Sequence, residues 1–519
     1  MADSSASTIR LLVALPEGAI PVWLNDLLLG LQEAESLDVR AVIAVAGDRR
    51  QSSASPILRV WQRLDRRLFL RDRDEEVQTD YERVSIDELP LQDLDAVAWL
   101  CVDRPPVELL TKTKFGCVAI ADAHSDEYGL AEFLGRAAAS ECHVIRFGES
   151  AGEDQLLATS ASTTDRLSLA RGLTELRAVA NTLLVSTLSK MAVGKDVALP
   201  APQLDVPGSL RIVLGLTILY LRYLIRFPSR FFCFDQWQMA YRIGGERLSQ
   251  SGLSRLVPDH RGFWADPFMV EYDGRKVLFF EEFAAETGRG HIAAMELQAD
   301  GQFGPPCDVL VCPYHLSYPF VFEFDGSLFM IPESAEAEKV EVFRCTRFPD
   351  SWESHATLLK DIRAYDTTLV EHDGMWWMFM TVQHSANSPN DELHLYYASQ
   401  PFGEWTPHPL NPVGLDVRTS RPAGRLFREN GRLYRPAQDC SGRYGRAIVI
   451  REVRRMTTTD YEEVSSTMIS PAWAGNAHAT HTVNQAAGVT VYDCEVRRRK
   501  RGLSSRRSSR PLPTVPESD

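Results

Sequence analysis

The feature that most constrains this chain is an internal repeat in its C-terminal half, from about residue 236 to about residue 496. Five similar segments each lead into a tight turn that ends in glycine. These turn glycines are Gly274, Gly326, Gly374, Gly431 and Gly488. In three copies an aspartate precedes the glycine, and in the fourth an asparagine does. Asp-Gly and Asn-Gly favour type I′ hairpin turns, because both central residues tolerate positive φ.

An apolar strand pattern follows each turn, and a third strand pattern follows that in most copies. Units of roughly 50 residues with several short antiparallel strands are typical of propeller blades. Five blades can close a ring that leaves no sheet edge open to other chains. The repeat therefore predicts an all-β five-bladed propeller over residues 236–496.

The region before the repeat has a different pattern, in which short apolar runs alternate with helical periodicity. The predicted strands are 9–15, 39–45, 94–102 and 117–121. The predicted helices are 21–35, 55–70, 107–112, 130–140 and 165–192. Such alternation predicts a Rossmann-like α/β domain over residues 1–195 with a mostly parallel sheet. The expected fold class is thus multidomain, with a linker and apolar helix at 196–235 between the two domains.

Charge and hydropathy restrict the partners. A formal charge of −14 and a pI near 5.4 argue against a nucleic-acid-binding protein. Residues 497–519 form a basic, Ser- and Pro-rich tail that we expect to be disordered. The apolar stretch 212–225 is too short to span a bilayer, so it predicts a packed inter-domain helix. Peripheral membrane contact through 211–232 or the basic tail is the alternative.

The nine cysteines have no paired spacing, which predicts reduced thiols rather than a disulfide framework or a zinc site. No secretory signal pattern opens the chain. We therefore expect a cytoplasmic protein, with a peripheral position at the inner membrane as the alternative.

The propeller predicts where a site would lie, because each innermost strand begins near the central axis. The residues that open the five repeats are Asp266, Tyr318, Asp366, Arg421 and His481. The end of the neighbouring strand contributes a second polar set: Glu281, Glu333, Thr381 and Gln438. Beside this ring stand the aromatic and imidazole side chains of Trp264, His315 and Tyr365.

Carboxylates can shuttle protons and stabilise an oxocarbenium-like centre, while aromatic rings pack on sugar C–H faces. The set therefore predicts carbohydrate recognition or glycosidic chemistry. The structural alternative is that these carboxylates cap strands or pair with arginines such as Arg421. No cofactor is expected, and the dispersed histidines suggest no metal constellation.

The repeat region resembles the five-bladed propellers of the family 43 glycoside hydrolases. It is more similar to the N-terminal domain of the plant glucosamine inositolphosphorylceramide transferases. The segments that carry the resemblance are 263–268, 279–282, 315–320, 331–333, 366–368, 421–424 and 434–442. The hydrolase resemblance implies Asp266 as general base, Glu333 as general acid and Asp366 as the carboxylate that tunes pKa. Tyr318 departs from it, because the family has an aspartate where the second blade starts.

The layout of the N-terminal region, with the run 19–24, resembles a formyltransferase-like domain. That family uses an Asn-x-His motif, and Ile120-Ala121-Asp122 stands where the motif is expected. His124 lies two residues further on. The resemblance therefore implies a degenerate enzyme or a scaffold.

Three functions fit these patterns. The first is a carbohydrate-active protein of surface-glycan or glycolipid biosynthesis, with a glycosyl-transferring or glycoside-hydrolase-like activity at the propeller axis. The second is a non-catalytic glycan-binding or scaffold protein, and the third a folate-dependent sugar formyltransferase. The first two take a sugar, a glycan or a glycolipid head group as their ligand.

Overall fold

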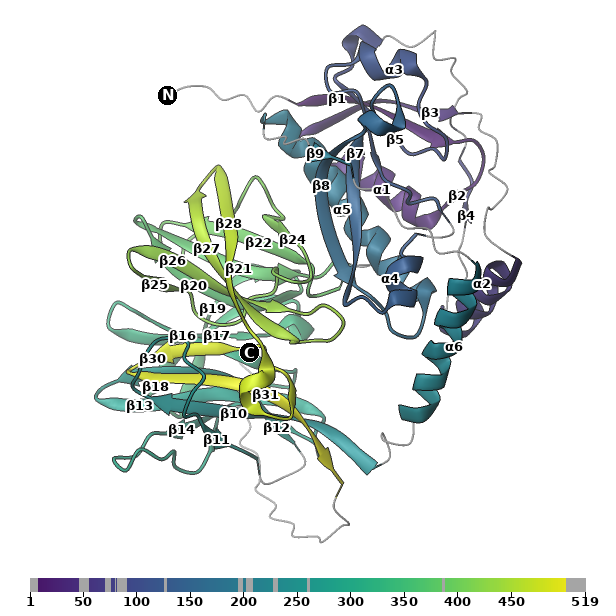
Figure 1. Cartoon of the computed structure of the whole chain (residues 1–519). Helices are drawn as coiled ribbons and strands as arrows, with labels where there is room; N and C mark the ends of the chain where they lie inside the picture. The colour runs from purple at the N-terminus through teal and green to yellow at the C-terminus, as the bar shows by residue number, and fades with distance from the viewer. Residues whose placement is uncertain are drawn as a thin grey trace. The chain divides into compact units, whose positions relative to one another are not determined.

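The structure is a computed structural model. It describes residues 8–45, 56–70, 76–79, 81, 91–125, 128–194, 199–201, 209–226, 232–258, 262–384 and 388–500. The chain forms two compact units, Met1–Arg222 and Tyr223–Asp519 (Figure 1). The expected basic tail lies outside the described residues from position 501 onward.

The first unit is an α/β domain around one seven-stranded sheet, in the order β3-β1-β5-β6-β7-β8-β9. Its strands are β1 (Ile9–Pro16), β3 (Leu37–Val45), β5 (Ala96–Trp99), β6 (Cys117–Ile120), β7 (Ala139–Arg146), β8 (Gln155–Thr163) and β9 (Leu199–Pro200). The first four pair in parallel, as their buried apolar sequences predict, and the last three join antiparallel. The sheet is therefore mixed, whereas a mostly parallel one was expected.

The β7–β8 hairpin is the largest departure from the sequence prediction in this unit. The helix predicted over 130–140 stops early, because α4 (Leu130–Gly135) is closed by Arg136 in the left-handed conformation. Strand β7 begins at Ala139 and pairs with β8 along its whole length. A left-handed residue after a helix ends it and lets the chain turn into a strand.

The helices of this unit lie at positions close to those predicted. They are α1 (Val22–Glu33), α2 (Pro56–Phe69), α3 (Val107–Lys112), α4 and α5 (Leu169–Ala192). Helix α5 packs against α1, β7 and β8 through a stripe of buried residues. The apolar stretch forms α6 (Ser209–Arg226), whose Ile212, Leu216 and Leu219 are buried. None of the helices in the described part of the chain has the length and hydropathy to cross a bilayer.

The second unit is a propeller of five antiparallel sheets, as the repeat predicts (Figure 1). Blade 1 contains β12 (Phe263–Tyr272), β13 (Arg275–Ala284), β14 (Arg289–Glu296) and β15 (Cys307–Leu310). Blade 2 contains β16 (Ser317–Phe324), β17 (Ser327–Glu333), β18 (Lys339–Arg347) and β19 (Ser351–Lys360). Blade 3 contains β20 (Ala364–His372), β21 (Met375–Val382), β22 (Glu392–Ala398), β23 (Thr406–Pro407) and β24 (Gly414–Leu415). Blade 4 contains β25 (Phe427–Glu429), β26 (Arg432–Asp439), β27 (Ala447–Thr457) and β28 (Asp460–Ile469).

Blade 5 closes the ring by combining early and late segments of this unit. It contains β10 (Cys233–Ile243), β11 (Ser254–Leu256), β29 (Ala477–Ala479), β30 (Val483–Ala486) and β31 (Val489–Arg499). Strand β10 pairs with β31 along its whole length. The basic run that was expected to open the tail therefore begins as strand, where Arg497 makes two hydrogen bonds to Asp235.

All five turn glycines occupy the predicted hairpins and have positive φ. The residue before each glycine also has positive φ, from 48° at Asp325 to 54° at Ala487. Two successive positive φ values are what a type I′ turn requires. The turn chemistry thus fixes where each innermost strand of a blade meets the next one.

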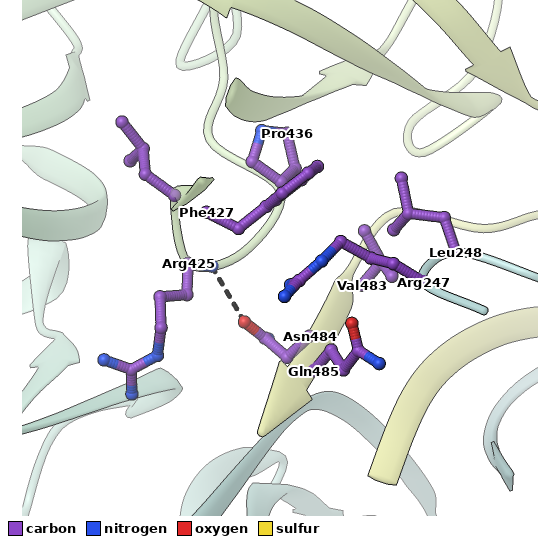
Figure 2. A pocket seen from close by; sticks show the side chains of 9 residues that line it. Arg247, Leu248, Arg425, Phe427, Pro436, Val483, Asn484 and Gln485 are labelled. Atoms are coloured by element: carbon purple, nitrogen blue, oxygen red, sulfur yellow. Dashed lines mark hydrogen bonds between the residues drawn. The ribbon is translucent and has the colours of Figure 1, made fainter. Parts of the chain in front are cut away.

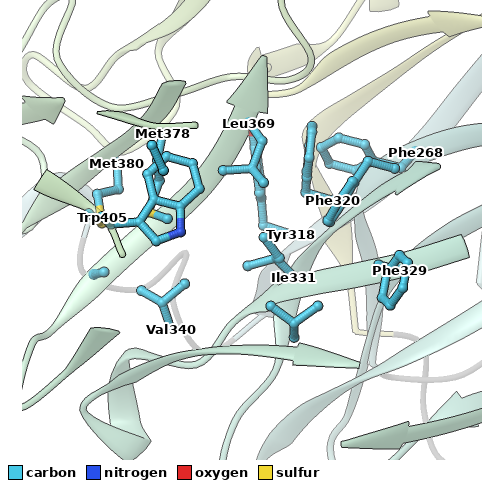
Figure 3. Packing of buried hydrophobic residues seen from close by; sticks show 14 of the residues in the cluster. Phe268, Tyr318, Phe320, Phe329, Ile331, Val340, Leu369, Met378, Met380 and Trp405 are labelled. Carbon is cyan, nitrogen blue, oxygen red and sulfur yellow. The ribbon is translucent and has the colours of Figure 1, made fainter. Parts of the chain in front are cut away.

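Apolar side chains from neighbouring blades interlock into continuous cores. The cluster in Figure 3 joins blades 1, 2 and 3 through Phe268, Phe320, Leu369 and Met378, all nearly inaccessible to solvent. A second cluster joins blade 5 to blade 1 around Met239, Leu278 and Phe280. These cores hold the innermost strands β12, β16, β20 and β30 side by side around the axis.

Candidate functional site

A shared backbone irregularity marks the start of three innermost strands. Asp266, Tyr318 and Asp366 have φ of 50°, 43° and 54°. At each of them the pairing with the next strand shifts register, which is a β-bulge. Aspartate tolerates left-handed backbone, but a tyrosine there is strained. Repeated strain of this kind is common where a fold aims side chains at a site.

Asp266 lies in a network supplied by blade 5. Its Oδ1 accepts a hydrogen bond from the Thr482 hydroxyl at 2.6 Å and lies 3.2 Å from Nε2 of His481. Nδ1 of His481 lies 2.8 Å from the carboxylate of Asp493. His481 is thus held between two carboxylates, and all three side chains are almost fully buried.

The electrostatics of this group keep Asp266 ionised. Burial by itself would lower the pKa of His481, but Asp493 and Asp266 raise it well above its usual value. Burial by itself would raise the pKa of Asp266, yet the His481 imidazolium lowers it below the ordinary value. Asp266 therefore has the charge state that a general base needs.

Asp366 lies in a network supplied by blade 4. Arg421 donates to both of its oxygens, at 2.7 and 3.3 Å, and Gln438 donates to Oδ2 at 2.8 Å. Arg421 also donates to Asn390, and its guanidinium lies 5.1 Å from the ring centres of both Tyr365 and Tyr444. Burial raises the pKa of Asp366 to about 7 despite the opposing effect of Arg421.

Glu281 makes fewer of the contacts described here than Asp266 and Asp366 do. Its Oε1 lies 3.3 Å from Nε2 of His315, whose Nδ1 accepts a hydrogen bond from the Gly290 backbone. That bond leaves the proton of the neutral imidazole on Nε2, pointing at Glu281. Burial, together with the charges of Asp266 and Glu333, raises the pKa of Glu281 well above its usual value.

Glycine is required beside this pair. A Cβ on Gly290 would lie 2.5 Å from Oε1 of Glu281 and 2.7 Å from a carbon of His315. Any larger residue would therefore separate the carboxyl from the imidazole.

Glu333 accepts hydrogen bonds on both oxygens, from the Ser317 hydroxyl at 3.0 Å and the Ala335 backbone at 3.1 Å. Burial raises its pKa, while Arg421 and these donors lower it. Asp266 and Glu333 both influence the pKa of Glu281 and that of Asp366, so the four carboxyls lie within electrostatic range of one another. The structure thus brings together all three residues expected to be catalytic.

The predicted binding residues divide into two groups. The first group belongs to the four-carboxyl cluster or contacts it as described above: Glu281, His315, Tyr365, Arg421, Gln438 and His481. Trp264 instead packs in the core between blades 5 and 1, with its ring 5.5 Å from that of Phe280. It lies among apolar side chains, where it would not stack on a sugar.

Tyr318 reaches the axis but not as a binding group. Its ring is buried in the core of Figure 3, against Phe268. Its hydroxyl accepts a hydrogen bond from Gly424 of blade 4 at 2.7 Å and lies 2.9 Å from the Thr368 hydroxyl of blade 3. Tyr318 therefore joins three blades, and its polar atom is already occupied.

Sequence reasoning missed Thr482, Asp493, Asn390 and Tyr444. Repeat register points to Glu495, which follows Gly488 by the same seven residues that separate Glu281 from Gly274. Asp493 stands two residues before Glu495 on the same face of β31, so strand alternation could have found it. Asn390 and Tyr444 lie in connections between strands, where no repeat register points to them.

The pocket in Figure 2 is separate from the carboxyl cluster. It lies between blades 4 and 5 and is lined by Arg247, Arg425, Phe427, Asn484 and Gln485, among others. The Asn484 amide oxygen accepts a hydrogen bond from the Arg425 backbone at 2.8 Å. It contains none of the four clustered carboxyls, so it is not part of the candidate site.

In the first unit, His124 follows the end of β6, with its ring centre 5.2 Å from that of Trp23. Burial lowers the pKa of His124 to about 4, helped by the charge of Arg177. Asp122, at the position where the motif residue was expected, is exposed and has left-handed backbone.

Comparison with known proteins places the propeller near one family. Residues 254–488 match the family model described as glucosamine inositolphosphorylceramide transferase 1, N-terminal. The rice (Oryza sativa subsp. japonica) glucosamine inositolphosphorylceramide transferase 1 is 36% identical over 210 residues. The Arabidopsis thaliana protein of the same name is 34% identical over 206 residues. Each match covers 39% of this chain but only 28% and 27% of the plant proteins. The chain thus spans less than a third of the relatives' length.

Among solved structures, a thermostable family 43 glycoside hydrolase aligns with 13% identity and a TM-score of 0.31. That alignment covers 40% of this chain and 76% of the hydrolase. A β-xylosidase, RS223, aligns with 11% identity and a TM-score of 0.34, covering 45% and 92%.

Proposed function

We propose that this chain is a carbohydrate-active enzyme of surface-glycan or glycolipid assembly, and that it binds a sugar at the four-carboxyl cluster. The observation that carries the proposal is the division of charge within that cluster. Asp266 is held ionised, whereas burial raises the pKa values of Glu281, Glu333 and Asp366. Paired carboxyls with pKa values pushed apart are the arrangement that acid–base cleavage or transfer of a glycosidic bond uses.

In this proposal Asp266 is the general base and Glu281 the general acid. Glu281 suits the proton donor better than Glu333, because Glu333 accepts hydrogen bonds on both oxygens. Such donors favour the ionised form of a carboxyl. Arg421, stacked between Tyr365 and the exposed Tyr444, would orient the sugar. The similarity to glycolipid-transferase N-terminal domains supports a glycolipid head group as the substrate class.

The test is a screen of nucleotide sugars, oligosaccharides and glycolipid head groups for binding and turnover. Wild type would be compared with Asp266→Asn and Glu281→Gln. Asp325→Asn, at a turn in blade 2, is the matched control. We expect both site variants to bind the ligand while turnover falls by about 10²–10⁴-fold. The control should keep full activity. Turnover that persists in both site variants would refute the acid–base assignment.

A non-catalytic glycan-binding protein is the second candidate. It is favoured by the complete set of protein partners around Asp366, which a structural ion pair would also have. Binding of a sugar without turnover in wild type, unchanged in both site variants, would establish it. Folate-dependent formyl transfer has the least support, because Ile120, Ala121 and Asp122 stand in place of the Asn-x-His motif.

We also propose that the first unit contacts anionic membrane surface through α2 and α6. The exposed stripe Val60, Leu64 and Leu68 on α2 is flanked by four arginines, at 59, 63, 66 and 67. Trp61 donates a hydrogen bond to Tyr220 of α6, and the neighbouring Leu221 is more than half exposed. Apolar stripes bordered by arginine are typical of helices that lie in the lipid interface.

Vesicle co-sedimentation tests this contact with vesicles that do or do not contain anionic lipid. We expect binding to the anionic vesicles, and at least a tenfold loss in the double variant Leu64→Glu, Leu68→Glu. Met468→Glu, an equally exposed apolar position in the propeller, is the control. Equal binding to neutral vesicles, or full binding by the double variant, would refute the contact.

A further inference from the structure

Three ligand-type side chains gather where blade 3 connects β21 to β22. His384 follows the end of β21, and Glu392 and His394 lie two residues apart on β22. Residues two apart on a strand point to the same face. Nδ1 of His384 and Nε2 of His394 each lie 3.3 Å from the same oxygen, Oε2 of Glu392. One ligand atom from each residue lies within 4.8 Å of the others.

These distances fit metal ligands better than hydrogen bonds. A charge-assisted N–H to carboxylate bond is about 2.7–2.9 Å long, so 3.3 Å is loose on both sides. A tetrahedral Zn²⁺ with ligands at about 2.0–2.1 Å separates neighbouring ligand atoms by about 3.3 Å. Both histidine-to-glutamate distances match this separation between ligand atoms.

Burial is graded across the three residues. The Glu392 side chain is 2% exposed, that of His394 is 12% and that of His384 is 59%. An ion here would bind the buried Glu392 carboxylate on one side and would face solvent on the other, where water could complete its coordination. Two imidazoles and one carboxylate are a ligand set that divalent transition metals use.

The other possible ligand groups among the described residues are poorer. Each of the three contains a single histidine. Asp235, beside His478, already makes two hydrogen bonds to the Arg497 guanidinium. His481 is held between Asp266 and Asp493 as a cation, which disfavours metal binding there.

We propose that His384, Glu392 and His394 bind one divalent transition-metal ion, with Zn²⁺ as the best match. The same connection carries two residues that contact the candidate site. Gln383 accepts a hydrogen bond from Tyr365, and Asn390 accepts one from Arg421. The ion would therefore hold both residues in place beside the four-carboxyl cluster. This site is independent of the proposed reaction, since it needs no sugar.

The experiment uses the full chain without an affinity tag, stripped with a chelator. Co²⁺ is titrated in and followed by its visible absorption, and Zn²⁺ is then added as competitor. We expect one equivalent of Co²⁺ to bind with the strong visible bands of a four-coordinate ion, and Zn²⁺ to displace it. His384→Ala and His394→Ala should each weaken binding at least tenfold. His355→Ala changes an exposed histidine whose ring centre lies 5.0 Å from that of Phe329, and this variant should bind as wild type does.

Thermal unfolding gives a second readout that separates loss of the metal from loss of the fold. Zn²⁺ should raise the Tm of wild type and of His355→Ala, but not of His384→Ala. Because His384 is mostly exposed, this variant should have the Tm of the stripped wild type. Absence of stoichiometric binding in wild type would overturn the proposal. So would binding that is equally strong in His384→Ala and His394→Ala.

Discussion

Asp266 in blade 1 and Asp366 in blade 3 stand at the same position of the repeat, each in left-handed backbone at a bulge. Both side chains are almost fully buried. The pKa of Asp266 is nevertheless lowered, whereas that of Asp366 is raised to about 7. The same backbone frame thus presents one carboxylate and one carboxyl that is partly protonated near neutral pH.

The difference comes from the adjoining blades. Blade 5 gives Asp266 a cation, His481, whose charge is itself stabilised by Asp493. Blade 4 gives Asp366 the guanidinium of Arg421, which it shares with Asn390. Asp366 also experiences the negative charges of Asp266 and Glu333. A blade therefore sets where its carboxyl points, and its neighbours set the protonation state.

Removal of the blade 4 cation should have the largest effect. Arg421→Met leaves Asp366 buried without a cation, and loss of one partner of a buried ion pair costs about 3–5 kcal/mol. We expect the low end, about 3 kcal/mol, because Asp366 can take up a proton near neutral pH. Urea denaturation at pH 7 measures the free energy of unfolding. Arg418→Met, which breaks a partly exposed pair with Asp416, should cost less than about 1 kcal/mol. Equal losses of unfolding free energy in Arg421→Met and Arg418→Met would contradict the assigned role of the blade 4 cation.

The two aspartates should give opposite pH dependences of stability. The folded pKa of Asp366, about 7, exceeds its ordinary value of 3.8. Its stabilising contribution is therefore complete below pH 3.8 and is lost as the pH rises through about 7. The pKa of Asp266 is lowered, so its contribution is present above pH 3.8 and is lost on acidification below that value.

Unfolding free energies measured from pH 3 to 8 test this difference. The free energy of unfolding of Asp366→Asn, relative to that of wild type, should increase as the pH rises from 4 to 7. Asp266→Asn should be least stable relative to wild type at neutral pH, and this difference in unfolding free energy should decrease toward pH 3. Parallel profiles for the two variants would show that the neighbouring blades do not set the charge states.

The smallest expected effect is the loss of one hydroxyl beside Asp266. Thr482→Val removes a 2.6 Å hydrogen bond to a charged acceptor, which costs about 1.5–3 kcal/mol. It should also raise the pKa of Asp266 toward that of Asp366, which NMR titration of the carboxyl carbon would detect. Thr490→Val is the control, because the Thr490 hydroxyl is buried and has no hydrogen-bond partner among the described residues. A Thr482→Val protein with an unchanged Asp266 pKa would contradict the assigned role of the hydroxyl.

The repeat predicted the architecture because turn chemistry is local. Asp-Gly and Asn-Gly pairs favour a hairpin through their own backbone conformation, and of the five turns only the fifth, with Ala487, lacks the favourable residue. Convergence of Asp266, Glu281, Glu333 and Asp366 could likewise be predicted from register. The β7–β8 hairpin could not, because its start depends on where α4 ends.

The roles of individual site residues were harder to predict. Trp264 and Tyr318 stand beside or at the repeat start, where polar function was expected, and both are buried in cores. A bulge interrupts strand alternation, so counting by two through it assigns the wrong face. Protonation states depend on residues far away in sequence, such as Thr482, which is separated from Asp266 by 216 positions.

The pairing of β10 with β31 also has a consequence for the order of assembly. Asp266 lies far before His481, Thr482 and Asp493 in the sequence, so a growing chain contains Asp266 before it contains these three partners. The strand that closes the ring carries Asp493, directly after the segment that carries His481. Closure of the ring and completion of the hydrogen-bonded group around Asp266 therefore depend on the same strand. A chain that stops short of β31 would lack both the closing strand and Asp493.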